Sequence, residues 1–483
     1  MSVYDEYDMT IGIECHVQLA TKTKLFSPAD NDARDAEPNA KVHEIDWGLP
    51  GVLPVLNEEA VCLAVRAGKA LNAAIAPISR FDRKHYFYPD LPKGYQISQM
   101  YQPIILAGHI DAPLEDDSVV KVRIHHAHLE EDAGKLTHFS DYSLVDLNRA
   151  GTPLIEIVSE PDIHSAAEAR AYATELYRLM TYAGVTHGNL YHGNMRFDVN
   201  ISVAKKGATE LGKRAEVKNL NSFRSVERAA EYEFKRQVDL LESGEKVVQE
   251  TRGWNDDKQI TTSQRSKEDA QDYRYMPDAD IPPIVLSDEE ITDIQASVPT
   301  LPGEYRKRWK DLNLDFSVVN TILEHQPVAI TLDSVVQDQG ANDVAKRVFN
   351  WFSSVQADDI DIAAVASGLV GPQRLTELSE MVSSNKLSST GAKDIFLALF
   401  DEIYKGMAPE DIAKEKNLLQ VSDESAIATI VDEVLNDPAS AASIADIKAG
   451  KDKAIGYLVG QIMKKSQGKA NPSLAQKLIR ERL

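Results

Sequence analysis

The segment from Thr10 to Leu19 brings two residues that bind metal ions onto one face of an expected strand. Apolar and polar residues alternate along it, and successive side chains of a strand point to opposite faces. Glu14 and His16 therefore share a face, with Cα atoms about 6.7 Å apart, so that both side chains can contact one cation. A strand with one solvated face gives the same alternation, and an isolated Glu-x-His pair favours that plainer interpretation.

A second carboxylate lies within an apolar strand pattern, from Thr152 to Ser159. Glu156 stands there among leucine, isoleucine and valine residues. Burial of a carboxylate is costly unless the group is paired or binds a cation. Two interpretations stay open: Glu156 is a cation ligand, or it forms a buried ion pair with Arg149, which is near it in sequence.

Two further segments add acidic residues. Residues 128–135 contain three consecutive acids before a glycine, and residues 196–202 alternate so that Asp198 shares a face with Asn200. A solvated turn and a solvated sheet face are the alternatives for these two segments. Several acids on separate strands form an oxygen-rich set, which suits Mg²⁺ better than zinc. Mg²⁺ in turn suggests phosphoryl chemistry, commonly with ATP.

Basic residues that would bind the phosphate groups gather in residues 80–93. Arg83, Lys84 and Lys93 lie there among tyrosines and prolines. A basic, aromatic loop that packs on its own sheet is the alternative. The sequence has no Gly-x-x-x-x-Gly-Lys-Ser/Thr motif, which argues against a P-loop. The histidines of residues 125–128 lack a matching distant pair, so we interpret them as strand residues rather than zinc ligands.

The elements that must position these groups are predicted from periodicity. Alternation between Pro- and Gly-rich loops predicts strands at Thr10–Leu19, Val119–His128, Thr152–Ser159 and Phe197–Val203. Three- and four-residue spacing predicts helices at Glu58–Leu71, Ala166–Tyr182 and Ser222–Glu242. These elements indicate an α+β domain with a largely antiparallel sheet.

The strand patterns fade after a proline pair, Pro282 and Pro283. We therefore expect a catalytic domain over residues 1–290, followed by two all-helical domains. The first would cover residues 291–406 and the second residues 407–483, with a hinge at Lys405–Pro409 between them.

Composition limits the class of protein. The 483 residues carry a formal charge of −22, which argues against a general nucleic-acid binder, but Lys451–Leu483 has eight basic and two acidic residues, a net charge of +6. Two cysteines exclude a disulfide framework. No run of about 18 apolar residues occurs, and the acidic N-terminus is unlike a signal peptide. We expect a cytosolic enzyme subunit.

Long motifs occur along nearly the whole chain, at Ile11–Leu19, Pro50–Asn57, Phe81–Asp90, Leu129–Lys135, Asp146–Glu156, Lys218–Phe223, Asp272–Asp278 and Gly468–Pro472. They resemble the motifs of the B subunit of aspartyl/glutamyl-tRNA amidotransferases, GatB. The resemblance implies that ATP phosphorylates the side-chain carboxylate of Glu-tRNA(Gln) or Asp-tRNA(Asn), and that ammonia then displaces the phosphate. Which of the two tRNAs is the physiological substrate stays open.

The resemblance also implies roles for single residues. At matching positions Glu14, His16, Glu131 and Glu156 would bind Mg²⁺, and Asp198 would be a further acidic residue of the catalytic site. The choice of Glu131 over its neighbour Glu130 rests on the resemblance alone. ATP is the second cofactor implied, with Arg83, Lys84 and Lys93 as the candidates for binding it.

Partners follow from the same resemblance. A glutaminase A subunit and a small C subunit would complete a heterotrimer, and no motif around either cysteine activates glutamine within this chain. The catalytic domain is likened to glutamine synthetase, and the helical domains hold tRNA. The basic tail supplies the candidates for binding tRNA, which are Lys464, Lys465, Lys469 and Arg480.

One departure from the family concerns zinc. Some members bind zinc through a Cys-x-Cys and a later Cys-x-x-Cys, but Ser27, Ala29, His43 and Asp46 take the equivalent positions here. We therefore expect no structural zinc.

Two other functions fit parts of the pattern. A non-catalytic scaffold that presents tRNA would not need the acidic residues, and a ligase acting on free amino acids would not need the basic tail.

Overall fold

The computed structural model describes residues 2–266, 272–355, 359–420, 424–448, 451–466 and 470–483. The chain folds into two compact units, Met1–Pro302 and Gly303–Leu483. The first contains a mostly antiparallel sheet with helices, and the second is helical. The predicted α+β class, with a sheet domain followed by a helical region, is confirmed at this level. Within the ranges described, no helix has the length and apolar character needed to cross a membrane.

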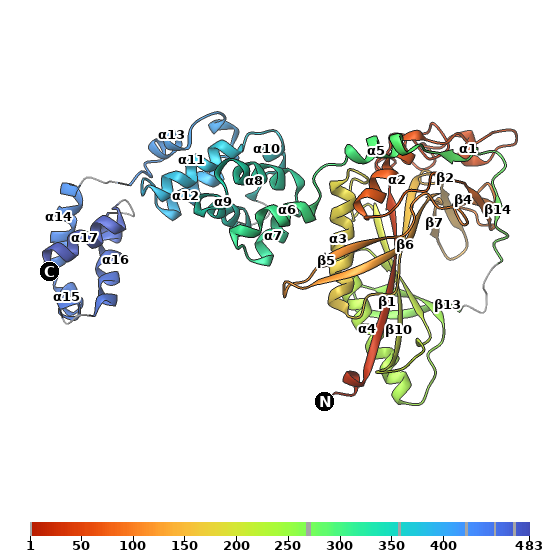
Figure 1. Ribbon diagram of the computed structural model, residues 1–483, viewed down its shortest axis with the longest axis horizontal. Coiled ribbons are helices and arrows are strands. Elements are labelled where there is room, and N and C mark those ends of the chain that lie inside the picture. Colours follow the sequence, from red (N-terminus) through yellow and green to blue (C-terminus); the bar gives the residue numbers. More distant parts are fainter. Residues whose placement is uncertain (1, 267–271, 356–358, 421–423, 449–450, 467–469) are drawn as a thin grey trace. The chain divides into compact units, whose positions relative to one another are not determined.

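An eight-stranded sheet forms the body of the first unit (Figure 1). Its strand order is β13-β12-β11-β10-β1-β9-β6-β5, and only the β11–β12 pair is parallel. The strands are β1 (Tyr7–Gln18), β5 (Gly108–Pro113), β6 (Val119–Glu131), β9 (Pro153–Ser159), β10 (Met195–Lys205), β11 (Ala215–Leu220), β12 (Glu250–Asn255) and β13 (Ile260–Ser266). The central strand β1 thus has neighbours on both sides.

Helices cover one face of this sheet. They are α2 (Glu58–Ala70), α3 (Ala166–Tyr182) and α4 (Phe223–Glu242). In Figure 1, α3 and α4 run along the strands, and their contacts extend from β5 and β6 to β10, β11 and β13. Ile11, Ile13, Cys15 and Val17 of β1 are fully buried in the core that these helices share. The even-numbered residues of β1 therefore point to the opposite, open face.

The predicted elements are confirmed with small differences at their ends. Helix α3 has the predicted bounds, and α4 begins one residue late because Ser222 is its N-cap and accepts a hydrogen bond from the backbone of Ser225. Strand β6 continues three residues beyond the predicted end, to Glu131. The acids Glu130 and Glu131 consequently lie on a buried strand and not in a solvated turn.

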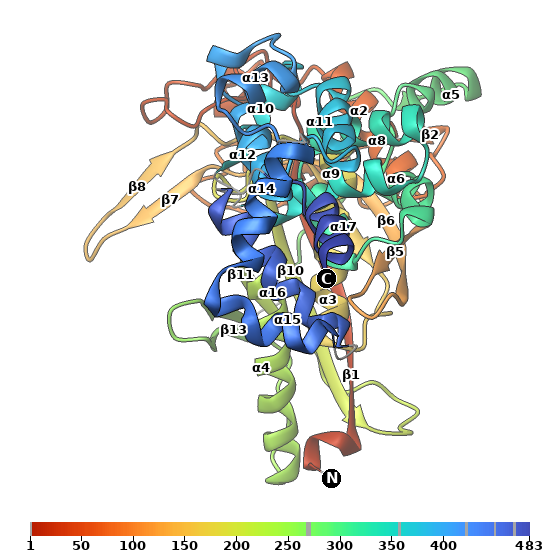
Figure 2. The same ribbon diagram turned by 90° about the vertical axis from the view of Figure 1, so that its left-hand side faces the viewer.

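Smaller elements surround the sheet. A three-stranded sheet contains β14 (Met276–Pro277), β3 (Asp82–His85) and β4 (Tyr95–Ser98). Figure 2 shows the hairpin of β7 (Lys135–His138) and β8 (Ser143–Asp146) standing away from the body of the unit. Helix α5 (Asp288–Ala296) packs on α2, so the compact unit continues past the proline pair at residues 282–283.

The second unit contains two groups of helices. The first group is α6 (Pro302–Trp309), α7 (Phe316–Ile322), α8 (Gln326–Gln339), α9 (Asp343–Ser354), α10 (Ile362–Ala366), α11 (Pro372–Ser383), α12 (Ser389–Ala398) and α13 (Pro409–Glu415). The second group is α14 (Glu424–Leu435), α15 (Ala441–Lys448), α16 (Ile455–Lys465) and α17 (Pro472–Arg482). Helices α14, α16 and α17 share a core of their own, which includes Val431, Leu458 and Leu478.

Helix α13 belongs with the helices that precede it. It packs on α11 and α12. Arg374 of α11 donates hydrogen bonds to the carbonyl oxygens of Tyr404 and Met407, which fixes the segment expected to be a hinge. The structural division between the two groups of helices therefore falls after α13, later than residue 407.

Candidate active site

The open face of the sheet collects polar side chains from adjacent strands. In the antiparallel register, His16 of β1 lies opposite Glu156 of β9, and Glu156 lies opposite His128 of β6. On the other side of β1, Glu14 lies opposite Asp198 of β10. Residues far apart in sequence thus meet because the antiparallel register places them side by side on the same face of the sheet.

His16, Glu130 and Glu156 form the first acidic group. The Nε2 atom of His16 lies 3.6 Å from a carboxylate oxygen of Glu130 and 3.6 Å from one of Glu156. His128 joins them, with its Nε2 atom 3.3 Å from Glu156 and 3.7 Å from Glu130. One ligand atom from each of the first three residues lies within 4.8 Å of the others, which is a donor set for a divalent cation.

Histidine and carboxylate side chains of this group stabilise each other's charged forms. Burial alone would raise the pKa of Glu156, but the hydrogen bond from His128 and the charges of His128, His16 and Lys84 hold that pKa below its usual range. Burial opposes the charge of His128 too, but its contacts with Glu130 and Glu156 raise its pKa to about 9. Glu156 is therefore ionised, as a carboxylate that binds a cation must be.

Glu14, Asp198 and Glu216 form the second acidic group, with ligand atoms within 4.8 Å of one another. The Nζ atom of Lys218 lies 2.7 Å from Asp198 and 3.2 Å from Glu216, and Asn200 donates a hydrogen bond of 2.9 Å to Glu14. Burial, followed by the neighbouring carboxylates, raises the pKa of Glu14. The second group therefore already contains a positive charge, the ammonium group of Lys218.

Glu131 faces away from both groups. Its two carboxylate oxygens lie 2.5 and 2.6 Å from the Nζ atom of Lys93, and one of them accepts a hydrogen bond from the backbone of Ile97. The structure does not bring Glu131 together with His16, as the resemblance implied. Glu130 stands there instead, because it shares the open face of β6 with His128.

The three candidates for binding ATP differ in what they contact. Arg83 pairs with Asp278 at 2.7 Å, and Lys93 is held by Glu131. Lys84 lies over the ring of Tyr273, and its charge acts on the open-face carboxylate Glu156. Among the residues that the structure describes, no carboxylate lies within salt-bridge distance of Lys84, which leaves it the best placed of the three to meet a phosphate.

Arg149 does not pair with Glu156, although the two residues are close in sequence. Its Nε atom lies 3.3 Å from Asp132, which also pairs with Arg196 at 2.9 Å. The partners of Glu156 in the described part of the chain are histidines, so the alternative of a Glu156–Arg149 ion pair is wrong.

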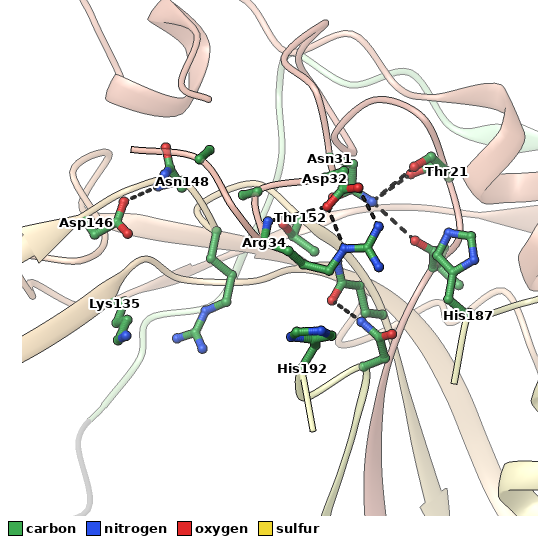
Figure 3. Close-up of a pocket in the computed structure, with 16 residues that line it drawn as sticks. Thr21, Asn31, Asp32, Arg34, Lys135, Asp146, Asn148, Thr152, His187 and His192 are labelled. Carbon is green, nitrogen blue, oxygen red and sulfur yellow. Dashed lines mark hydrogen bonds and ion pairs between the residues drawn. The ribbon is translucent and has the colours of Figure 1, made fainter. Parts of the chain in front are cut away.

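Cavities open at both ends of the acidic face. The larger, of about 440 Å³, begins at Gln18, two residues along β1 from His16. Figure 3 shows Asp32 and Arg34 on one side of it and Lys135 and Asp146 on the other. The smaller, of about 220 Å³, lies beside Glu14 and is lined by Thr10, Gly12, Ser159, Asn200, Ser202 and Arg214, among others.

The comparison with known proteins decides the family. The sequence profile of the GatB/GatE catalytic domain matches residues 9–292. The chain belongs to this family. A second profile, described as a GatB domain, matches residues 332–483. Residues 1–8 and 293–331 lie outside the two matches.

Full-length relatives agree with the GatB profiles. The chain is 46% identical over 487 residues to the B subunit of the aspartyl/glutamyl-tRNA(Asn/Gln) amidotransferase of Halorhodospira halophila, and the alignment covers 99% of both. The protein of the same name from Polynucleobacter asymbioticus is 44% identical over 492 residues, covering 99% of this chain and 100% of the relative. The one from Persephonella marina is 42% identical over 485 residues, again covering 99% of this chain and 100% of the relative. The resemblance inferred from the motifs is confirmed.

In this GatB chain the positions of the family's zinc-binding cysteines form a different cluster. Asp46, on the short helix α1 (Glu44–Trp47), accepts hydrogen bonds from Lys24 at 3.2 Å, from Ser27 at 3.0 Å and from the backbone of His43 at 2.9 Å. Lys24 is fully buried, and burial lowers its pKa despite the charge of Asp46. An ammonium group thus lies against the carboxylate in the region where the resemblance would place zinc in some members.

We predict that the purified GatB chain contains no stoichiometric zinc. The side chains of Ser27 and Ala29 supply no thiolate, and Asp46 is already paired with Lys24. Elemental analysis measures the zinc content directly, and incubation with a chelator should leave the midpoint of thermal unfolding unchanged. About one tightly held zinc per chain, lost together with stability on chelation, would contradict the prediction.

Two residues of the GatB site, Glu216 and Lys218, were not among those predicted from the sequence. Both lie on β11, where they alternate with the buried residues Ala215 and Val217 and so face the open side. The alternation of apolar and charged residues over positions 215–218 is the sequence signal that predicts this strand.

Proposed function

We propose that the open face of the sheet is where ATP phosphorylates the side-chain carboxylate of a misacylated tRNA before ammonia displaces the phosphate. As a family member, the chain is an amidotransferase B subunit, an ATP-dependent carbon–nitrogen ligase that forms Gln-tRNA and Asn-tRNA. The observation that carries the position of the site is the gathering of two acidic groups on adjacent strands of one sheet face.

We assign the cation to the first group. His16, Glu130 and Glu156 fit Mg²⁺ because their ligand atoms lie within 4.8 Å of one another and two of the three residues offer carboxylate oxygens. Mg²⁺ bound there would neutralise charge on the phosphate oxygens. Glu130 replaces Glu131 in the ligand set implied by the resemblance, and Glu14 and Asp198 face the reactants from the second group.

We place the nucleotide in the larger cavity, at the C-terminal end of β1 beside Gln18. The larger cavity has a volume of about 440 Å³, within the range of roughly 300–1,000 Å³ of small-molecule sites. Lys135 and Arg149 line it, and Lys84 is the third cation near the acidic face. These basic side chains would bind and orient phosphate groups, which the carboxylates around them would repel.

The remaining parts of the proposal concern domains and partners. The catalytic domain, residues 1–290, has the glutamine-synthetase-like architecture that the resemblance implies, and the two helical domains hold tRNA. Ammonia comes from a glutaminase A subunit, and a small C subunit completes the heterotrimer. Lys464, Lys465 and Arg480 are tRNA contacts; Lys469, the fourth candidate, lies outside the described residues.

A single-turnover experiment tests the function. The complex purified with its partners is mixed with γ-labelled ATP and either misacylated tRNA or free glutamate. We expect labelled phosphate and amide to form only with the misacylated tRNA. Turnover with free glutamate would point to a ligase for free amino acids, and tRNA binding without any labelled phosphate would point to a scaffold.

A further inference from the structure

Four tyrosines contact one another edge to face and form a continuous row, which we call the tyrosine row. The ring centroids of Tyr86 and Tyr273 lie 6.1 Å apart, and those of Tyr273 and Tyr275 lie 6.2 Å apart. Tyr101 ends the row, 63% exposed, with its centroid 6.4 Å from that of Tyr275. The four residues come from segments next to β3, β14 and β4, which the three-stranded sheet brings together.

Backbone pairing with β3 fixes the middle of the tyrosine row. Met276 of β14 lies opposite Arg83, and the backbone amide of His85 donates a hydrogen bond of 2.8 Å to the carbonyl oxygen of Tyr273. Arg274, between the two central tyrosines, has a φ of 42°, in the left-handed region that residues other than glycine rarely adopt. The backbone that carries these rings is thus fixed before a ligand arrives, which lowers the entropy cost of binding.

The inner part of the tyrosine row lies near the first acidic group. Burial and the charges of Glu130 and Glu156 raise the pKa of Tyr275 to about 12, so its hydroxyl is neutral and close to these carboxylates. Lys84, whose charge acts on Glu156, has its Nζ atom 4.9 Å from the ring centroid of Tyr273. The row therefore extends from the proposed cation site to solvent.

Rows of aromatic rings with a nearby cation are typical of sites for single-stranded nucleic acids. Bases stack on the rings, and any base can do so because every base has a π-face. In the proposed function the amino acid is esterified to the last nucleoside of the tRNA. Phosphorylation of its side chain at the cation site therefore brings the unpaired 3′ end of the tRNA to the same place.

The adenine of ATP is the other base that could stack on these rings. Among the described residues that line the larger cavity, where we place the nucleotide, none belongs to the tyrosine row. The tRNA also has more need of the row, because the chain has a formal charge of −22, which opposes the binding of polyanions elsewhere on its surface. The 3′ end of the tRNA is therefore the occupant that the chemistry favours.

We propose that the tyrosine row is the subsite for the unpaired 3′ end of the misacylated tRNA, whose last bases stack on its rings. This inference rests on the proposed function and adds a binding site for its substrate. Stacking reads little sequence, so the row accepts Glu-tRNA(Gln) and Asp-tRNA(Asn) alike. It holds the esterified amino acid beside the first acidic group while the basic tail binds the body of the tRNA.

Two forms of tRNA(Gln), intact and trimmed of its unpaired 3′ nucleotides, test the proposal on the complex purified with its partners. The wild-type complex should bind the intact form more tightly. Tyr101→Leu should weaken binding of the intact form by about 10-fold, the effect of losing one stacked base, and leave binding of the trimmed form unchanged. Tyr101→Phe keeps the ring and is the matched control, expected to retain the preference for the intact form.

Fluorescence gives a readout that a purely structural role would not move. A fluorescent purine in place of the terminal base should be quenched when the tRNA binds the wild-type complex, because a stacked base loses its emission. The quenching should be weaker with Tyr101→Leu than with Tyr101→Phe. In amidation assays Tyr101→Leu should raise KM for the aminoacyl-tRNA and leave KM for ATP unchanged.

The outcomes separate this inference from the proposed function. Equal affinity of the wild-type complex for intact and trimmed tRNA, or unchanged affinity of Tyr101→Leu for intact tRNA, would overturn the inference. A raised KM for ATP with unchanged tRNA affinity would also overturn it, since the row would then bind the nucleotide. A complex that prefers intact tRNA through Tyr101 but forms no labelled phosphate would contradict the proposed function instead.

Discussion

Glu156→Gln and Glu14→Gln are expected to abolish amide formation while leaving the fold intact. Glutamine keeps the shape of each side chain, but it carries no charge for a cation or for the histidine partners of Glu156. We expect amidation to fall by about 10³-fold, the upper range for loss of one preorganised electrostatic group. Glutaminase activity of the partner should survive at its basal level. Near-normal amidation by both variants, with unchanged Mg²⁺ dependence, would show that the site is assigned wrongly.

The adjacent residues Glu130 and Glu131 offer a matched pair for the same experiment. Glu130→Gln should weaken Mn²⁺ binding, because Glu130 lies 3.6 Å from His16 in the first group. Glu131→Gln should leave Mn²⁺ affinity unchanged but destabilise the protein by about 3–5 kcal/mol, because it breaks a buried ion pair with Lys93. Isothermal titration with Mn²⁺ and chemical unfolding measure the two effects separately. The reverse pattern would restore Glu131 to the ligand set.

Alternation was sufficient to predict most of the acidic face. The period of two in residues 10–19 and 152–159 put Glu14, His16 and Glu156 on strand faces before their neighbours were known. The choice between Glu130 and Glu131 needed one more fact, the end of β6. Ending the strand at residue 128 leaves both acids in a turn, whereas continuing it to residue 131 assigns them to opposite faces.

Pairing between distant residues could not be predicted from the sequence. Arg83 finds Asp278 through the pairing of β3 with β14, 195 residues apart, and Lys93 finds Glu131 across 38 residues. A count of basic residues in one loop treats them as equivalent phosphate ligands. The strand pairing decides which of them already has a carboxylate partner, and no local pattern contains that information.

The same limit applies to the basic tail. Residues 451–483 have a net charge of +6, but α14 and the start of the tail supply acidic partners. Lys465 lies 3.0 Å from Glu433, and Arg480 lies 3.1 Å from Asp452. These are exposed pairs, typically worth about 0–1 kcal/mol, so phosphate groups can displace them. Lys464 is exposed, and no carboxylate in the described ranges pairs with it.

Removing the last group of helices is expected to weaken tRNA binding and to raise KM for the aminoacyl-tRNA. The structure favours a cut before residue 424 over one at residue 408, because α13 packs on α11 and α12 and its loss would disturb the preceding helices. The chain without residues 424–483 should still bind as many Mn²⁺ ions as the full-length chain, since the acidic groups lie in the first compact unit. This count distinguishes weakened tRNA binding from a damaged active site.

Charge reversal at Lys464, Lys465 and Lys469 tests the interactions with phosphate themselves. Removing one phosphate interaction lowers the slope of log affinity against log salt by about 0.9 for duplex nucleic acid. Reversal should therefore weaken binding most at low salt and flatten this dependence, with little effect on which tRNA is preferred, because interactions with phosphate carry no sequence information. The exposed lysine Lys206, in the first compact unit, provides a control reversal that should change neither affinity nor slope. If the triple variant and the truncated chain bind tRNA as tightly as the wild type and with the same slope, the tail is not the tRNA-binding arm.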